Sequence, residues 1–316
     1  MMHATPLELS PSAIPHTRAV MDRASSENFP VAARVLPSAD RRHLLAVYGF
    51  ARLADELGDE PGVSPPDRLA ALDWLEGELD RAYAGNARHP LLVGLQRTLS
   101  ERSLPREAFV RLIEANRLDQ RVSRYDTWEQ LRAYCSLSAD PVGELVLGVF
   151  GLATPERIEL SSSVCTALQL AEHLQDVGED LRRGRVYVPE QDLRRFGSSH
   201  EQLIQLGARA GMDLDLRGVP ADSSTVSDDF RRAADHLRET ISFESTRARE
   251  LLAAGVPLVA SVGGRHKLAV AAFVAGGRAA LEEIERARCD VLAGVAQAGR
   301  SRRLRALARV LVESRA

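Results

Sequence analysis

Apolar residues recur at helical spacing along nearly the whole chain, and no segment shows the alternation that is typical of a strand. Leu69, Leu72, Leu75 and Leu79, for example, fall three and four residues apart and so share one face of an α-helix. Ala, Leu and Arg are abundant and aromatic residues make up only 5% of the sequence, a balance that favours helix over strand. We therefore expect an all-α fold.

Proline, glycine and capping residues divide this pattern into separate helices. Pro61-Gly62 ends one helix, and Ser64-Pro65 starts the next. Thr154 followed by Pro155 has the chemistry of an N-cap with proline at the first helical position, and we expect that helix to reach Asp180. Residues 197–229 are polar and weakly patterned. The predicted helices cover approximately residues 45–59, 65–84, 90–100, 105–121, 127–139, 141–151, 155–180, 230–254, 267–291 and 302–312.

The chain length limits the domain organisation. At 316 residues the chain lies near the size at which one hydrophobic core stops growing. Prolines near the start predict a flexible N-terminal tail over residues 1–17, and residues 18–316 are predicted to form a single all-α domain. A helical bundle of this size can enclose a central apolar cavity, with polar groups projecting inward from facing helices.

Charge and targeting features exclude several classes of protein. The 41 basic and 44 acidic residues give a net charge of −3, which argues against a nucleic-acid binder. The chain has neither a secretory signal nor a stretch of 18 uncharged apolar residues, so we expect a cytoplasmic protein. The segment 302–312 is basic and amphipathic. It is either a peripheral contact with a membrane surface or a plain surface helix.

Two acidic clusters share the pattern D-x-x-x-D, Asp55 with Asp59 and Asp176 with Asp180. Residues four apart lie on one face of a helix, where two carboxylates repel each other unless a cation lies between them. Mg²⁺ takes one or two carboxylates and completes its coordination with water and substrate phosphates. Acid pairs at this spacing also occur on solvated helix faces. Here the first pair follows an apolar stretch that contains Tyr48, so a paired Mg²⁺ site and a solvated surface both remain open at this point.

Four blocks of sequence carry a resemblance to a known family. They are Ser26–Pro37 (SENFPVAARVLP), Tyr48–Glu60 (YGFARLADELGDE), Tyr134–Gly151 (YCSLSADPVGELVLGVFG) and Gln169–Leu193 (QLAEHLQDVGEDLRRGRVYVPEQDL). In order and spacing they resemble the squalene/phytoene synthase family, from about residue 18 to residue 290. The phrases ENFPVA and SADPVG are most similar to its hydroxysqualene synthase (HpnC) branch.

The resemblance implies a fold and a set of site residues. The fold would be the single-domain isoprenoid synthase helical bundle around a central apolar cavity. The four aspartates would bind Mg²⁺ and, through it, the diphosphate of a prenyl substrate. The substrate-binding residues would be Arg52, Gln169, Arg183 and Arg185. The catalytic residues would be Tyr48, Glu172 and Tyr187. The basic run that includes Arg183 reads otherwise as a solvated loop.

Two positions depart from the family pattern. Glu172 stands where Asn is usual, and Gln175 stands where Arg is usual. Glu172, one turn before Asp176, could add a metal contact or act on water, so Glu172 and Tyr48 are both hypotheses for the group that activates water.

The reaction implied by the resemblance is the conversion of presqualene diphosphate and water to hydroxysqualene and diphosphate, with Mg²⁺ as cofactor. Within the family the alternatives are presqualene diphosphate synthase, squalene synthase and phytoene synthase, which condense two prenyl diphosphates. No G-x-G-x-x-G follows a strand, so a Rossmann nucleotide site is not indicated. Outside the enzyme class, a non-catalytic helical assembly factor or a lipid carrier would share the bundle but would not need the four aspartates.

Overall fold

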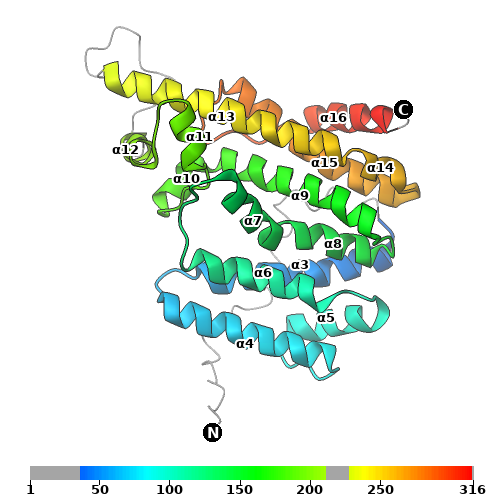
Figure 1. Cartoon of the computed structure of the whole chain (residues 1–316). Helices are drawn as coiled ribbons and strands as arrows, with labels where there is room; N and C mark the ends of the chain where they lie inside the picture. The colour runs from blue at the N-terminus through cyan, green and yellow to red at the C-terminus, as the bar shows by residue number, and fades with distance from the viewer. Residues whose placement is uncertain (1–35, 211–227, 315–316) are drawn as a thin grey trace. The chain divides into compact units, whose positions relative to one another are not determined.

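A computed structural model describes residues 36–210 and 228–314 (Figure 1). Within these ranges the chain forms helices and no strand, and one isolated bridge pairs Arg124 with Val186. The predicted all-α fold is confirmed. The helices are α3 (Ser38–Asp59), α4 (Pro65–Tyr83), α5 (Pro90–Glu101), α6 (Arg106–Asp119), α7 (Trp128–Ser138), α8 (Asp140–Val149), α9 (Pro155–Gln175), α10 (Val177–Arg182), α11 (Glu190–Arg195), α12 (His200–Ala210), α13 (Asp228–Gly255), α14 (Pro257–Ser261), α15 (Gly264–Arg286) and α16 (Arg300–Glu313).

The helices belong to two compact units. Of the described residues, unit 1 contains residues 36–121, Leu137–Glu159 and Val262–Ala269, and unit 2 contains Val122–Ser136 and residues 160–210, 228–261 and 270–314. The predicted tail, residues 1–17, lies outside the described residues, and so does most of the block that starts at Ser26. The single domain over residues 18–316 stays a prediction.

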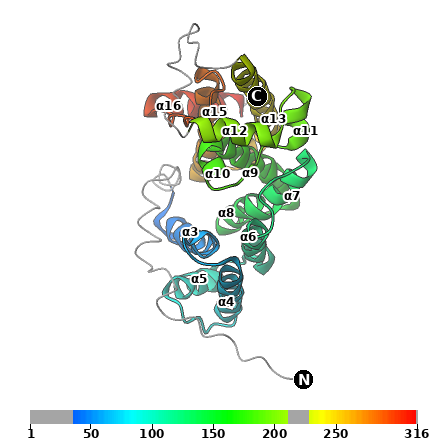
Figure 2. The same cartoon turned by 90° about the vertical axis from the view of Figure 1, so that its left-hand side faces the viewer.

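Helix α3 forms the centre of unit 1. It packs against α4, α5, α6 and α8, and Figure 2 shows it beside them. Leu44, Phe50 and Leu53 on its inner face are at most 2% exposed. The Phe50 ring meets Phe109 of α6 edge to face, with 4.9 Å between the ring centroids. This packing fixes the rotation of α3 and therefore decides which of its side chains remain accessible.

Local capping chemistry accounts for two of the helix starts that the sequence predicted. The Asp67 backbone N–H donates to the Ser64 hydroxyl at 3.4 Å at the start of α4. At the start of α9, the Arg157 N–H donates to the Thr154 hydroxyl at 3.3 Å. Each bond satisfies one of the backbone donors that the first turn of a helix leaves without an intrahelical partner.

Close helix approaches in unit 2 depend on glycine. In α13, a Cβ at Gly255 would fall 3.1 Å from the Leu160 carbonyl oxygen of α9 and closer still to the Val164 side chain. In α15, a Cβ at Gly277 would fall 2.7 Å from Leu168 of α9. Helices α13 and α15 therefore pack tightly against α9 at these glycines. This packing fixes the position of α9, which leads into the second acidic pair.

The helices differ from the prediction in several places. Helix α3 begins at Ser38, before its predicted start at residue 45, and α11 and α14 were not predicted. The α9 helix ends at Gln175 and a separate helix, α10, carries Asp180. Helix α12 forms in the weakly patterned region, where burial of Leu203 and Leu206 supplies the packing. Helix α15 ends at Arg286 because Arg288 and Cys289 adopt positive φ angles of 54° and 58°, which an α-helix cannot accommodate. None of the described helices is both long and apolar enough to cross a membrane.

Candidate active site

The first acidic pair lies at the C-terminal end of α3. Tyr48, Arg52, Asp55 and Asp59 follow one another at helical spacing along this helix, as the sequence predicted. Tyr48 and Arg52 are half-buried, whereas Asp55 and Asp59 are exposed. The Arg52 guanidinium lies 3.7 Å from the Glu56 carboxylate one turn later. The two aspartates thus stand at the accessible end of a helix whose opposite face is fixed in the core.

Asn116 of α6 positions this pair. Its side-chain amide donates to the Asp55 carboxylate at 3.2 Å and to the Leu112 carbonyl at 3.1 Å. The same side chain fills the space beside Gly58, where a Cβ would lie 3.1 Å from the Asn116 Cγ and inside van der Waals contact of its Oδ1. One turn later, the Gln120 amide donates to the Gly58 carbonyl at 2.9 Å. Helix α6 therefore orients one carboxylate of the pair, a role that the sequence did not reveal.

The second acidic pair spans the junction of α9 and α10. The Asp176 N–H donates to the Glu172 carbonyl at 3.0 Å, and the Asp180 N–H donates to the Asp176 carbonyl at 2.8 Å. The helical bonds thus continue on both sides of Asp176 although α9 ends just before it, and the four-residue spacing still keeps the pair within one turn.

Gly178, between the two aspartates, permits a close backbone contact. A Cβ at this position would lie 2.9 Å from the Leu292 carbonyl carbon and closer still to its oxygen. Leu292 itself is 3% exposed and belongs to the segment between α15 and α16. The second acidic pair is therefore built on a turn that the C-terminal segment can approach closely only because residue 178 is glycine.

The carboxylates of the second pair carry an electrostatic cost. Desolvation by burial, increased by the neighbouring charge of Asp176, raises the pKa of Asp180 to about 7, although Arg185 and Arg183 oppose the rise. Desolvation also raises the pKa of Asp176, followed by the effect of Glu179. The positive charge of the nearby arginines is thus too small to offset the burial and mutual repulsion of these carboxylates.

This electrostatic environment fits a divalent cation. A carboxylate pair with raised pKa values is stabilised in its ionised form by a hard cation, and oxygen is the ligand that Mg²⁺ prefers. Within residues 36–210 and 228–314, no three His, Cys, Asp or Glu side chains come together as a ready-made metal site. A cation at the second pair would therefore take its remaining ligands from water and phosphate.

A cluster of rings lies next to the second pair. His173 stacks on Tyr187 with 3.7 Å between centroids and an angle of 11°, and Tyr134 and Tyr125 lie 5.6 and 5.8 Å from the same tyrosine. Burial, followed by the Arg185 charge, lowers the pKa of His173 to about 3, so the imidazole is neutral. Tyr125 and Tyr134 were not identified as site residues.

His173 also connects Gln169 to Asp180. The Gln169 amide nitrogen lies 3.0 Å from the His173 Nε2, which accepts its hydrogen bond in the neutral ring. The other ring nitrogen, Nδ1, lies 3.9 Å from the Asp180 carboxylate. Gln169, predicted to bind substrate, therefore orients the imidazole through this bond. Glu172, one turn before Asp176, is exposed.

The loop after α10 carries the predicted arginines. Arg183 is exposed and pairs with Glu179 at 2.7 Å. Arg185 is half-buried, and its backbone N–H donates to the Asp180 carbonyl at 2.9 Å. The Val186 N–H donates to the Ser123 carbonyl at 2.7 Å, which fastens the loop to the segment before α7. The loop therefore holds Arg185 and Tyr187 close to Asp180, while Arg183 points toward solvent.

The predicted residues form two groups. Tyr48, Arg52, Asp55 and Asp59 lie together in unit 1, and the other seven lie together in unit 2, namely Gln169, Glu172, Asp176, Asp180, Arg183, Arg185 and Tyr187. That both groups act on one substrate, across an apolar cavity, stays a prediction. The sequence did carry one sign of close packing at each acidic motif, namely an interior glycine, Gly58 or Gly178. Glycine weakens a helix, so a glycine inside one usually has a packing reason.

A family model described as squalene/phytoene synthase matches residues 22–307. This chain belongs to the squalene/phytoene synthase family. Among its relatives, a hydroxysqualene synthase from Rhodopseudomonas palustris is 34% identical over 67% of this chain and 72% of its own length. A 15-cis-phytoene synthase from Synechococcus elongatus is 33% identical over 57% of this chain and 62% of its own length.

A solved member of the family shares the fold. The crystal structure of the squalene synthase HpnC from Alicyclobacillus acidocaldarius is 41% identical in sequence. It has a TM-score of 0.73 and covers 88% of this chain and 94% of its own chain. The predicted isoprenoid synthase fold is therefore confirmed. The family acts on prenyl diphosphates, and the two acidic pairs and the arginine-bearing loop are compatible with this substrate class.

Proposed function

We propose that this enzyme converts presqualene diphosphate and water to hydroxysqualene and diphosphate. The observation that carries the proposal is the Asp176–Asp180 pair, whose carboxylates have raised pKa values beside an arginine-bearing loop. Such a pair favours a bound cation. This cation and the neighbouring arginines would together bind the negative charge of a diphosphate. The similarity to hydroxysqualene synthases supports this branch of the family.

Asp55, Asp59, Asp176 and Asp180 are the residues that would hold Mg²⁺. When bound, Mg²⁺ would neutralise the diphosphate and so favour its departure. Arg185 would contact the diphosphate from the loop next to Asp180, and Arg52 would do so from α3 one turn before Asp55. Arg183, which is exposed and paired with Glu179, would contribute long-range positive charge. These groups stabilise the leaving group as its charge develops.

The reaction needs no reductant. The C–O bond breaks with its electron pair leaving on the diphosphate, the resulting carbocation rearranges as the cyclopropane opens, and water adds to it and then loses a proton. The aromatic faces of Tyr187 and Tyr134 would stabilise nearby positive charge, because ring faces attract cations. Glu172 and Tyr48 are the candidates to accept the proton from water. The exposure of Glu172 makes it accessible to solvent for proton release.

Incubation of the purified chain with single substrates distinguishes the activities within the family. We expect presqualene diphosphate to give hydroxysqualene without NADPH. Conversion of farnesyl diphosphate alone would instead indicate presqualene diphosphate synthase or squalene synthase. Condensation of geranylgeranyl diphosphate would indicate a phytoene synthase, which the similarity to the Synechococcus elongatus enzyme keeps as the second candidate.

A matched pair of variants distinguishes an enzyme from a non-catalytic assembly factor. Asp176→Asn should lower turnover by about 100-fold or more, since it removes a carboxylate that would hold Mg²⁺ at the diphosphate site. Asp235→Asn is the control, because Asp235 is an exposed aspartate whose carboxylate pairs with Arg238 on the same helix. Both variants should keep the thermal midpoint of the wild type. Normal turnover by Asp176→Asn would remove the metal assignment.

The substrate and product of this reaction carry long hydrocarbon chains that partition into membranes. We propose that the enzyme exchanges them with a membrane surface, and the basic helix α16 is the element of this chain that suits such a contact.

A further inference from the structure

Helix α16 presents apolar side chains to solvent. Leu304 and Val312 are 65% and 66% exposed, more than any other large apolar side chain of the described residues. They lie eight residues apart with Ala308 midway, and Ala308 is also exposed. At a spacing of four, the three residues form one stripe along the helix. The opposite face packs on unit 2 through Ala306 and Val310, which are buried. The stripe is therefore an apolar face that the fold leaves uncovered.

The same helix is strongly basic. Its 14 residues include five arginines, Arg300, Arg302, Arg303, Arg305 and Arg309, and one acid, Glu313. Arg302 pairs with Glu283 of α15, and Arg278 of α15 pairs with Glu313. Positive charge on both sides of an apolar stripe is the pattern of helices that lie in the headgroup region of an anionic membrane.

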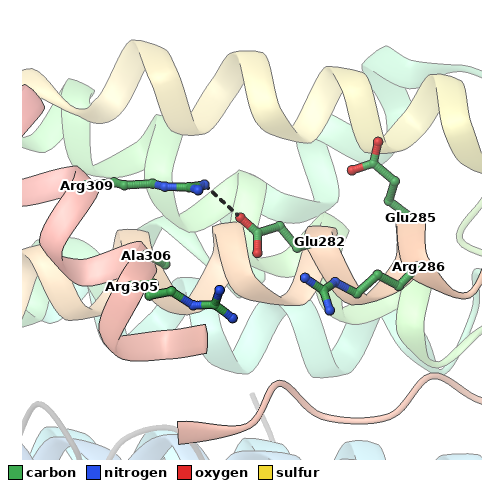
Figure 3. A pocket seen from close by; sticks show the side chains of 6 residues that line it. All are labelled: Glu282, Glu285, Arg286, Arg305, Ala306 and Arg309. Carbon is green, nitrogen blue, oxygen red and sulfur yellow. Dashed lines mark hydrogen bonds and ion pairs between the residues drawn. The ribbon is translucent and has the colours of Figure 1, made fainter. Parts of the chain in front are cut away.

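A recess of about 410 Å³ lies between α15 and α16 (Figure 3), and Arg305 in its lining directly follows Leu304 of the stripe. It is lined by Glu282, Glu285, Arg286, Arg305, Ala306 and Arg309. Arg309 engages Glu282 at 3.5 Å, and Arg249 engages Glu285 at 3.0 Å. Each acid of the recess therefore already has a cationic partner.

Two arginines of the recess are available to a ligand. No ion pair joins Arg286 or Arg305 to any residue in the described part of the chain. Figure 3 shows their guanidinium groups extending toward each other below Glu282. Two unneutralised guanidiniums at the edge of an apolar stripe match the chemistry of a phospholipid, whose phosphate is anionic and whose chains are apolar.

We propose that this face of α16 docks on a membrane containing anionic phospholipids. Leu304, Ala308 and Val312 enter the acyl-chain boundary, and a headgroup phosphate occupies the recess between Arg286 and Arg305. Charge complementarity selects this occupant over a second copy of the chain, because two copies of so basic a helix would repel each other. The docking does not depend on which reaction the enzyme catalyses, so its failure would remove the proposed membrane exchange and leave the proposed reaction untouched.

Co-sedimentation of the full chain with vesicles tests the proposal. The vesicles are made of phosphatidylcholine alone or of phosphatidylcholine mixed with phosphatidylglycerol. We expect binding to the mixed vesicles, at least about tenfold weaker binding to the neutral ones, and release as salt is raised. The double variants Leu304→Ser with Val312→Ser, and Arg286→Gln with Arg305→Gln, should each weaken binding to mixed vesicles by about tenfold or more.

The control for charge is the double variant Arg88→Gln with Arg97→Gln, which removes two exposed arginines from other parts of the chain. It should bind mixed vesicles like the wild type, and all variants should keep the wild-type thermal midpoint. Equal binding to neutral and mixed vesicles would overturn the proposal, and so would wild-type binding by either α16-face variant. A dimer that Leu304→Ser with Val312→Ser dissociates, without vesicle binding, would assign the face to a second copy and also overturn it.

Discussion

Gly178→Ala tests whether the second acidic pair depends on the close approach of the C-terminal segment. The added methyl group would lie 2.9 Å from the Leu292 carbonyl carbon and closer to its oxygen, so a backbone segment must move. Overpacking of this kind costs about 1–3 kcal/mol or more. The gain of alanine over glycine in a helix is at most about 1 kcal/mol and offsets only part of that cost. We expect a lower free energy of unfolding and displaced carboxylates at Asp176 and Asp180.

The control is Gly276→Ala in α15. A Cβ there would meet no atom within 4 Å, so the same substitution should be neutral or stabilise the protein by about 0.5–1 kcal/mol. Denaturant unfolding measures both variants, and turnover of presqualene diphosphate measures the consequence for the site. A misplacement of about 1 Å can lower a rate by about 100-fold, so Gly178→Ala should lose far more activity than stability.

If Gly178→Ala unfolds and turns over like Gly276→Ala, the Leu292 backbone does not constrain the acidic pair. Loss of stability with full turnover in the remaining folded protein would show that the contact holds the fold without placing the carboxylates.

Two further predictions concern protons. Because the pKa of Asp180 is raised to about 7, its carboxylate is protonated below that pH when no metal is bound. The affinity for Mg²⁺, measured by titration, should therefore rise with pH and level off above about 7. An affinity that does not change with pH would contradict this. Burial and the nearby Asp192 raise the pKa of Glu244 to about 8, well above its usual 4.5, although Arg247 opposes the rise. The folded state thus binds the extra proton, and stability falls as pH rises from about 4.5 to 8, by up to a few kcal/mol at about 1.4 kcal/mol per pKa unit. In urea unfolding, Glu244→Gln should remove most of this pH dependence, and an unchanged slope would count against the buried carboxyl as its source.

Local sequence chemistry predicted most of the fold. The end of α3 and the start of α4 follow from Pro61-Gly62 and from the Ser64 cap, which act over a few residues. The break at Asp176 was not predicted, because the helical spacing of the polar residues continues unbroken from α9 into α10. Helix α12 was missed because its large apolar residues, Leu203, Ile204 and Leu206, occupy a single turn within a polar region, and its stability comes from packing against α10 and α13.

The sequence identified the charged groups of the site but not the residues that hold them. Asn116 lies 61 residues from Asp55, and nothing in its neighbourhood marks it as a partner of a carboxylate. Tyr125 and Tyr134 meet Tyr187 only after the loop that follows α10 has folded back. Contacts of this kind depend on tertiary packing, whereas the D-x-x-x-D pattern depends only on the helical repeat.

The glycines of the two acidic motifs differ in one respect that a double-mutant cycle can measure. Beside Gly58 the obstacle is the Asn116 side chain, whereas beside Gly178 it is backbone. Gly58→Ala should therefore destabilise the protein by about 1–3 kcal/mol. Combining it with Asn116→Ala should cost less than the sum of the two single changes, since the smaller side chain removes the obstructing amide.

For the second motif, Leu292→Ala should give no such relief to Gly178→Ala, because the Leu292 carbonyl remains in place. Urea unfolding of the single and double variants measures both coupling energies. Equal coupling in the two motifs would contradict the geometry. A coupling confined to Gly58 and Asn116 would show that one acidic pair is supported by a side chain and the other by the path of the main chain. In that case, side-chain substitution can retune the first pair, whereas the second can be moved only by moving the segment between α15 and α16.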